Sequence, residues 1–249
     1  MKKTNILLGS AVLVASLVNA GSVFAATGTG SDPIPDTANT PVSTILTVPN
    51  TETPKAPTDP DEPDKGLNKQ GNVNGEDGNL GIAYYPKAFS FSGKLGDDTL
   101  VLKDSGTNVA QGVTYNIGVK DNTHTNNSWT LTAKLSWTTG KLPGSKIKLT
   151  NNGVVKQNIN NGTDDFKTAD LVNQDPQVVN GVSDVSIGND STAIMTKADS
   201  TIGIGTYDYQ LAKLGELELN IPNATSLKAG GYEGIVTWNL EVVPGTAVN

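Results

Sequence analysis

The fold of this chain is decided by the stretch Ser128-Trp129-Thr130-Leu131-Thr132-Ala133-Lys134-Leu135. Apolar residues occupy every second position from Trp129 to Leu135, and polar residues occupy the positions between them. Because successive side chains of an extended strand point to opposite faces, one face of this stretch is apolar and the other is polar. Such alternation predicts a β-strand that packs one face against a core.

The same pattern returns near the C-terminus. Trp238 and Leu240 share one face with Val236 and Val242, while polar residues stand between them. The two stretches thus share a Trp-x-Leu pattern with a polar residue at its centre, about 110 positions apart. Chance is a poor explanation of such a repeat, which therefore predicts two related core strands.

Short alternating segments recur from Leu80 onward, separated by turn clusters rich in Asn, Gly, Asp and Pro. The clearest hairpin candidate is Asn151-Asn152-Gly153. Apolar residues nowhere keep a helical spacing beyond two turns, so we expect an all-β fold, an antiparallel sandwich or barrel-like domain. The expected strands are 99–103, 113–120, 128–136, 146–150, 214–222 and 232–243.

The composition excludes several functions. The chain has 249 residues, no cysteine, no arginine, one histidine and a net charge of −7. Disulfides and thiolate sites are excluded, a zinc hydrolase lacks its paired histidines, and nucleic acid would meet no basic cluster. His124 and the pairs Asp97-Asp98 and Asp164-Asp165 stand among loop residues and fit turns better than catalysis. We therefore expect no enzyme, no catalytic residue, no metal site and no cofactor.

The N-terminal third has a different composition. Residues 1–25 carry two lysines, an apolar run and small residues around Ala25, the build of a secretory signal peptide. Residues 26–79 hold eight of the thirteen prolines and no aromatic residue, so they predict a disordered, extended linker. The folded domain is expected at residues 80–249. No later apolar run is long enough for a membrane helix, so we expect a secreted protein with no transmembrane segment after cleavage.

The paired motifs, their spacing and their place near the C-terminus make the chain resemble the WxL domain family of secreted Gram-positive surface proteins. The motif residues are Trp129 and Leu131 in the first copy and Trp238 and Leu240 in the second. Further points of resemblance are the segments 80–86, 89–91, 119–121 and 230–232 and Pro244 after the second motif.

The resemblance implies non-covalent attachment to the cell wall, with peptidoglycan as the ligand. It also implies an alternative: a protein-interaction subunit of a surface complex, docking a membrane-anchored companion or a host matrix protein without direct glycan binding. The tryptophans admit two interpretations. They pack in the core as a folding signature, which alternation with leucine favours, or they expose ring faces to a sugar or a partner.

Overall fold

The computed structural model describes residues 39–48, 51–58, 66–71, 73, 78–105, 113–174, 177–199 and 201–245. The expected signal peptide, residues 1–25, lies outside this part of the chain. The folded unit is Leu46–Asn249. Among the described residues, no helix combines the length and the apolar composition needed to cross a membrane.

The prediction of an all-β, antiparallel sandwich is confirmed, because the described strands form three antiparallel sheets. The six-stranded sheet has the order β1 (Asn68–Gln70), β2 (Leu80–Pro86), β4 (Thr114–Asp121), β12 (Gly205–Lys213), β7 (Val155–Asn158) and β8 (Leu171–Asn173). The β14 sheet has the order β14 (Glu233–Val243), β5 (Ser128–Thr139), β11 (Thr192–Lys197) and β9 (Val179–Gly181). The β3 sheet has the order β10 (Ser186–Ile187), β6 (Lys146–Lys148), β13 (Glu218–Ile221) and β3 (Leu100–Lys103).

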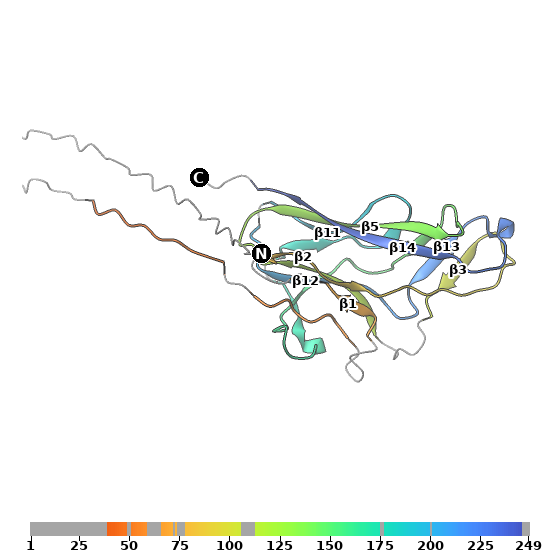
Figure 1. Cartoon of the computed structure of the whole chain (residues 1–249), viewed down its shortest axis with the longest axis horizontal. Helices are drawn as coiled ribbons and strands as arrows, with labels where there is room; N and C mark the ends of the chain where they lie inside the picture. The colour runs from red at the N-terminus through yellow and green to blue at the C-terminus, as the bar shows by residue number, and fades with distance from the viewer. Residues whose placement is uncertain are drawn as a thin grey trace, which may run out of the picture. The chain divides into compact units, whose positions relative to one another are not determined.

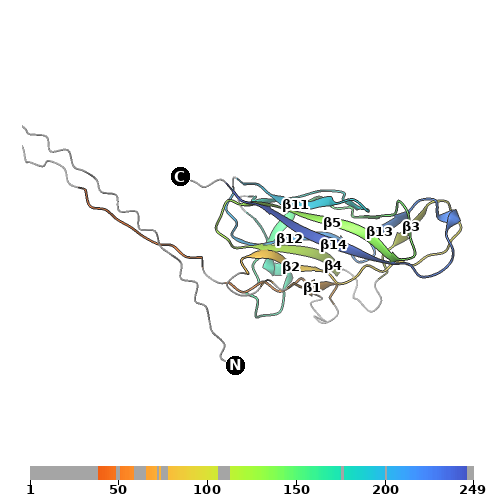
Figure 2. The same cartoon turned by 45° about the horizontal axis from the view of Figure 1, so that its top comes forward.

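The six-stranded sheet and the β14 sheet form the two layers of the sandwich, and the β3 sheet lies at one end of them (Figure 1). Turning the molecule brings the long strands β5 and β14 to the front, side by side (Figure 2). One apolar cluster fills the space between the layers and continues into the β3 sheet. Two short 3₁₀ helices, Thr168–Asp170 and Ala224–Ser226, interrupt the connections.

Strands β4 and β12 form the centre of the six-stranded sheet and are buried on both faces. Tyr207 and Tyr209 of β12 point into the sandwich core, while Thr206 and Asp208 on the opposite face of the strand are also buried. Residues 206–211 alternate polar and apolar side chains, the pattern of a half-exposed strand. The alternation does not reveal that the polar side chains of Thr206 and Asp208 are buried as well, because the second face of the strand is also covered.

The segment Asn151-Asn152-Gly153 turns the chain, but the hairpin prediction is wrong. The strands on either side of it, β6 and β7, belong to different sheets and do not pair with each other. Gly153 has a φ of +71°, and a Cβ there would lie 2.8 Å from the carbonyl oxygen of Gly181. The turn therefore carries the chain from one sheet to another under a close backbone contact.

Residues Thr51–Thr58, which composition assigns to the linker, are packed against the folded unit and are called the strap here. Four of their side chains are buried: Thr53, Pro54, Ala56 and Pro57. The strap covers the outer face of the six-stranded sheet, where Ala56 clusters with Ala83 and Tyr84. Of the other residues of the expected linker, 26–38, 49–50, 59–65, 72 and 74–77 lie outside the described residues.

Side chains of the sheet, rather than a neighbouring strand, bond the backbone of the strap. Gln70 accepts from the backbone N–H of Ala56 at 2.9 Å and donates to the carbonyl of Pro54 at 3.0 Å. Asn158 donates to the carbonyl of Lys55 at 3.0 Å. A proline-rich segment cannot form a regular ladder because proline lacks the N–H group. Amide side chains replace that ladder, so the strap is ordered without being a strand.

A polar cluster on Asp208 lies beneath the strap. The carboxylate of Asp208 accepts from Tyr84 Oη at 2.7 Å and from Asn116 Nδ2 at 2.8 Å. Tyr84 Oη also accepts from Asn158, the residue that holds the strap. Burial raises the pKa of Asp208 to about 6, although the bonds from Tyr84 and Asn116 and the charge of Lys156 each lower it.

This pKa makes stability depend on pH. Because the pKa of Asp208 is higher in the folded state than its ordinary value of 3.8, the fold favours the protonated form. The contribution of Asp208 to the free energy of unfolding is therefore greatest below pH 4 and falls as the pH rises to about 6, by about 3 kcal/mol. Urea unfolding of the wild type and of Asp208→Asn between pH 4 and 7 measures this contribution. The other titratable groups are the same in both proteins, so their effects cancel in the difference between the two free energies of unfolding. Equal pH profiles in the two proteins would contradict it.

Candidate functional site

The two Trp-x-Leu motifs lie on the neighbouring strands β5 and β14, which run antiparallel. In the register of this pair Leu131 stands opposite Leu240, and Trp129 stands opposite Val242. Trp238 stands opposite Ala133. Each indole thus faces a smaller side chain across the strands, while the two leucines face each other between them. Cross-strand pairs of this kind stabilise an antiparallel sheet.

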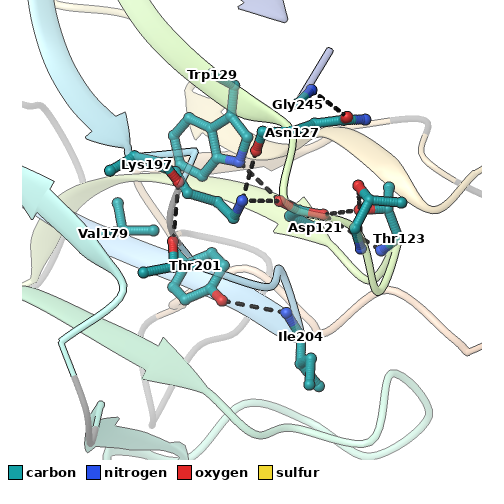
Figure 3. Close-up of polar contacts among 12 residues, drawn as sticks. Asp121, Thr123, Asn127, Trp129, Val179, Lys197, Thr201, Ile204 and Gly245 are labelled. Atoms are coloured by element: carbon teal, nitrogen blue, oxygen red, sulfur yellow. Dashed lines mark hydrogen bonds and ion pairs between the residues drawn. The ribbon is translucent and has the colours of Figure 1, made fainter. Parts of the chain in front are cut away.

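The first motif is part of the core. Trp129 is 1% exposed and Leu131 is fully buried. The ring of Trp129 lies 6.2 Å from that of Tyr207 on the opposite layer. Its indole Nε1 donates to the carboxylate of Asp121 at 2.8 Å, as Figure 3 shows. A buried indole N–H needs such a partner, and Asp121 at the end of β4 supplies it.

Asp121 also joins a buried ion pair. The ammonium of Lys197 on β11 lies 4.0 Å from the carboxylate of Asp121, and both side chains are almost fully buried. Burial lowers the pKa of Lys197, while the charges of Asp121 and Asp199 raise it. Thr123 donates to the same carboxylate at 2.7 Å. Asp121 therefore joins Trp129 of the first motif to the charged side chain of Lys197, which stands opposite Trp129 on the neighbouring strand β11.

The same cluster holds the end of β14. Lys197 donates to the backbone carbonyl of Asn127, and the side chain of Asn127 accepts from the backbone N–H of Gly245 at 2.9 Å (Figure 3). Gly245 follows the last residue of β14 by two positions. The polar cluster thus fixes the C-terminal end of the strand that carries the second motif.

The second motif is not fully buried. Trp238 and Leu240 are half-buried, and Ile235 on the other face of β14 is 55% exposed. The reason is position, because β14 is the edge strand of its sheet and pairs with β5 alone among the described strands. The two motifs therefore have the same sequence pattern and different environments.

Trp238 lines a cleft of about 1010 Å³, called the β14 cleft here. Its walls come from residues 85–95, from the loop at residues 227–232 and from the first half of β14. Its floor consists of side chains of the sandwich core: Leu100, Leu135, Leu142, Ile147, Leu219 and Ile221. The cleft is thus an opening in the side of the sandwich, beside the free edge of β14.

The described lining of the β14 cleft is aromatic and basic. It holds six aromatic residues, Tyr85, Phe89, Phe91, Trp137, Tyr232 and Trp238, and three lysines, Lys87, Lys94 and Lys228. It contains no aspartate, glutamate, asparagine or glutamine. Tyr232 is fixed by a hydrogen bond from its hydroxyl to the carbonyl of Lys228 at 2.8 Å. It also lies against Gly140, where a Cβ would approach its ring to 2.6 Å.

The structure therefore divides the four motif residues predicted from sequence. Trp129 and Leu131 lie in the core, and Leu240 is half-buried opposite Leu131. Of the four, only Trp238 lines the cleft. Sequence reasoning used Phe89, Phe91 and Tyr232 only as points of resemblance and missed them as cleft residues. Their concentration in two short segments was the available signal. No group of His, Asp and Glu within the described residues could hold a metal ion.

Comparison with known proteins gives one result. A family model described as WxL domain surface cell wall-binding matches residues 35–244. The match covers both motifs, the strap and the residues of the β14 cleft. No curated protein and no solved structure matches the chain.

Proposed function

The chain belongs to the WxL domain family of surface proteins that bind the cell wall, and we propose that its ligand in the wall is peptidoglycan, bound in the β14 cleft. The protein reaches the wall by secretion, with residues 1–25 as the signal peptide. It is held there without a covalent bond. The family is one of binding domains, and the proposed function is likewise binding.

The observation that carries this proposal is the position of Trp238. One motif tryptophan is buried and bonded within the core, whereas the other is half-buried and lines an open cleft with five further aromatic residues. A role in folding alone explains why the first tryptophan, Trp129, is buried. It does not explain why the second, Trp238, is only half-buried. Aromatic side chains in a pocket supply much of the binding energy of protein interfaces, so Trp238 is suited to ligand contact.

Replacing Trp238 by alanine is expected to weaken sedimentation with peptidoglycan sacculi by about 30-fold, the effect of losing a binding hot spot. The sacculi are stripped of protein and teichoic acid. Thr237→Ala is the matched control, because Thr237 is exposed on the opposite face of the same strand. Circular dichroism and thermal unfolding check that both variants keep the fold. Full binding by a folded Trp238→Ala variant would show that the tryptophan is not the contact.

A second candidate function is a subunit that docks a companion surface protein. The free edge of β14 favours it, since an exposed strand edge is a common site for a partner's strand. The same sedimentation experiment separates the two candidates. Binding to cells that keep their surface proteins, without binding to stripped sacculi, would support docking and reject direct wall binding.

A further inference from the structure

Resting on the proposed function, we propose that the β14 cleft takes the peptide part of peptidoglycan, laid as an extended strand along the free edge of β14, and not the sugar chain. Peptidoglycan combines two chemistries, a neutral glycan rich in hydroxyl and acetamido groups and short alanine-rich peptides that carry free carboxylates. The cleft can therefore be tested against each.

The backbone of β14 is open to pairing along its free edge. This strand runs over eleven residues, Glu233–Val243, and among the described strands it pairs with β5 only. Every second residue of such a strand points its N–H and C=O away from its neighbour. Edge strands are commonly protected by proline, lysine or bulges. β14 has no proline or lysine, and its one register irregularity lies at its first residues, Glu233 and Gly234. Its edge offers peptide hydrogen bonds that a sugar chain does not match.

This free edge of β14 borders the β14 cleft. Gly234, Ile235, Val236 and Trp238 all line it. A peptide paired with β14 would lie along the cleft, and the side chains of its inner face would enter it. The floor they would meet is apolar core, which suits methyl groups and short alkyl chains.

The described lining of the cleft is poor in side-chain oxygen acceptors. Recognition of a sugar needs side-chain acceptors and donors for its hydroxyl groups, since buried polar groups must be hydrogen-bonded. The described lining has no carboxylate and no carboxamide, and Ser92 is its one aliphatic hydroxyl. The indole of Trp137 is already committed to Ser145 Oγ at 2.9 Å. The described lining therefore offers few side-chain oxygen acceptors for the hydroxyl groups of a glycan.

The charge of the cleft is opposite in sign to that of the whole chain. The chain has a net charge of −7, yet the described lining of the cleft holds three lysines and no acid. Lys94 and Lys228 are exposed at its rim. In the part of the chain that the structure describes, neither forms an ion pair with a carboxylate. A local positive field in an acidic protein fits a ligand with free carboxylates, which the wall peptides have and the glycan backbone lacks.

The experiment compares three ligands with the full-length mature protein. These are intact sacculi, glycan strands freed of peptide by an N-acetylmuramyl-L-alanine amidase, and the soluble peptides released by that digestion. The digestion leaves a lactyl carboxylate on each freed muramic acid, so the glycan strands also test whether a carboxylate without the peptide is enough for binding. We expect binding to intact sacculi, at least tenfold weaker binding to peptide-free glycan, and competition by the released peptides at millimolar concentration. Equal binding to peptide-free glycan overturns this inference and leaves the proposed function standing. No binding to intact sacculi overturns both.

Two further measurements test the strand and the charge. Synthetic alanine-rich wall peptides should compete for sacculi, and the same peptides N-methylated at alternate amides should not, because N-methylation removes the donors that pair with β14. The double variant Lys94→Gln and Lys228→Gln should bind sacculi about three- to tenfold more weakly at low salt. Lys134→Gln with Lys141→Gln is the matched control, since both lysines are exposed outside the cleft. Undiminished competition by the N-methylated peptides contradicts strand pairing.

Discussion

Replacing Trp129 by alanine is expected to lower the free energy of unfolding by about 3–5 kcal/mol, the usual cost of removing a large aromatic side chain from a core. Two terms combine here. The ring is 1% exposed and packs toward Tyr207, and its Nε1 is a hydrogen-bond donor to the buried carboxylate of Asp121. Since small domains are stable by about 5–15 kcal/mol, this loss is a large share of the total.

Chemical unfolding of three variants separates these terms. Trp129→Phe keeps most of the ring and loses the N–H, so it should cost about 1–3 kcal/mol, the penalty for an unpaired buried acceptor. Trp238→Ala should cost less than Trp129→Ala, because Trp238 is half-buried on an edge strand. If Trp129→Ala keeps nearly full stability and loses wall binding, the first motif is a contact and not a core element.

The contrast between the two tryptophans shows how far the repeated motif could be interpreted from sequence. Alternation around Trp129 and Trp238 correctly predicts two strands with apolar inner faces. It does not reveal that one strand is internal to its sheet and the other is at the edge. That difference comes from which strands pair, and it decides whether the same residue pattern is buried or open.

The strap and strands β4 and β12 show a second limit of the sequence. Proline content predicts a solvated linker because it excludes a regular ladder, but side chains such as Gln70 and Asn158 bond the strap backbone instead. With the strap in place, Asn116 and Asp208 become buried polar groups on strands covered on both faces. Neither effect leaves a periodic signal, because each depends on residues far apart in the chain.

The β14 cleft could not be predicted from the sequence either. Its lining gathers residues from the 85–95 segment, from the 227–232 loop and from β14, which meet only through the packing of two sheets. Phe89, Phe91 and Tyr232 are conspicuous in the sequence as a concentration of aromatic residues. Their shared cavity becomes apparent only once β14 is placed at the edge beside them.

The buried pair of Asp121 and Lys197 gives the second large expected effect. Asp121→Ala leaves the ammonium of Lys197 buried without its counter-charge and removes the acceptor of the Trp129 indole. Breaking a buried ion pair in this way typically costs about 3–5 kcal/mol. We expect Asp121→Ala to lower the free energy of unfolding by that amount.

Adding Lys197→Met should restore part of this loss, because an apolar side chain of similar length carries no charge to desolvate. The double variant should therefore be more stable than Asp121→Ala alone, and the double-mutant cycle with both single variants should give a coupling energy of about 1–3 kcal/mol. The loss that remains should be about 1–3 kcal/mol, the penalty for leaving the buried indole N–H of Trp129 without its acceptor. If the double variant is no more stable than Asp121→Ala, the ammonium is not held by the carboxylate. Asp121 would then act mainly through the indole and Thr123, and its role would be to fix the first motif rather than to neutralise a buried charge.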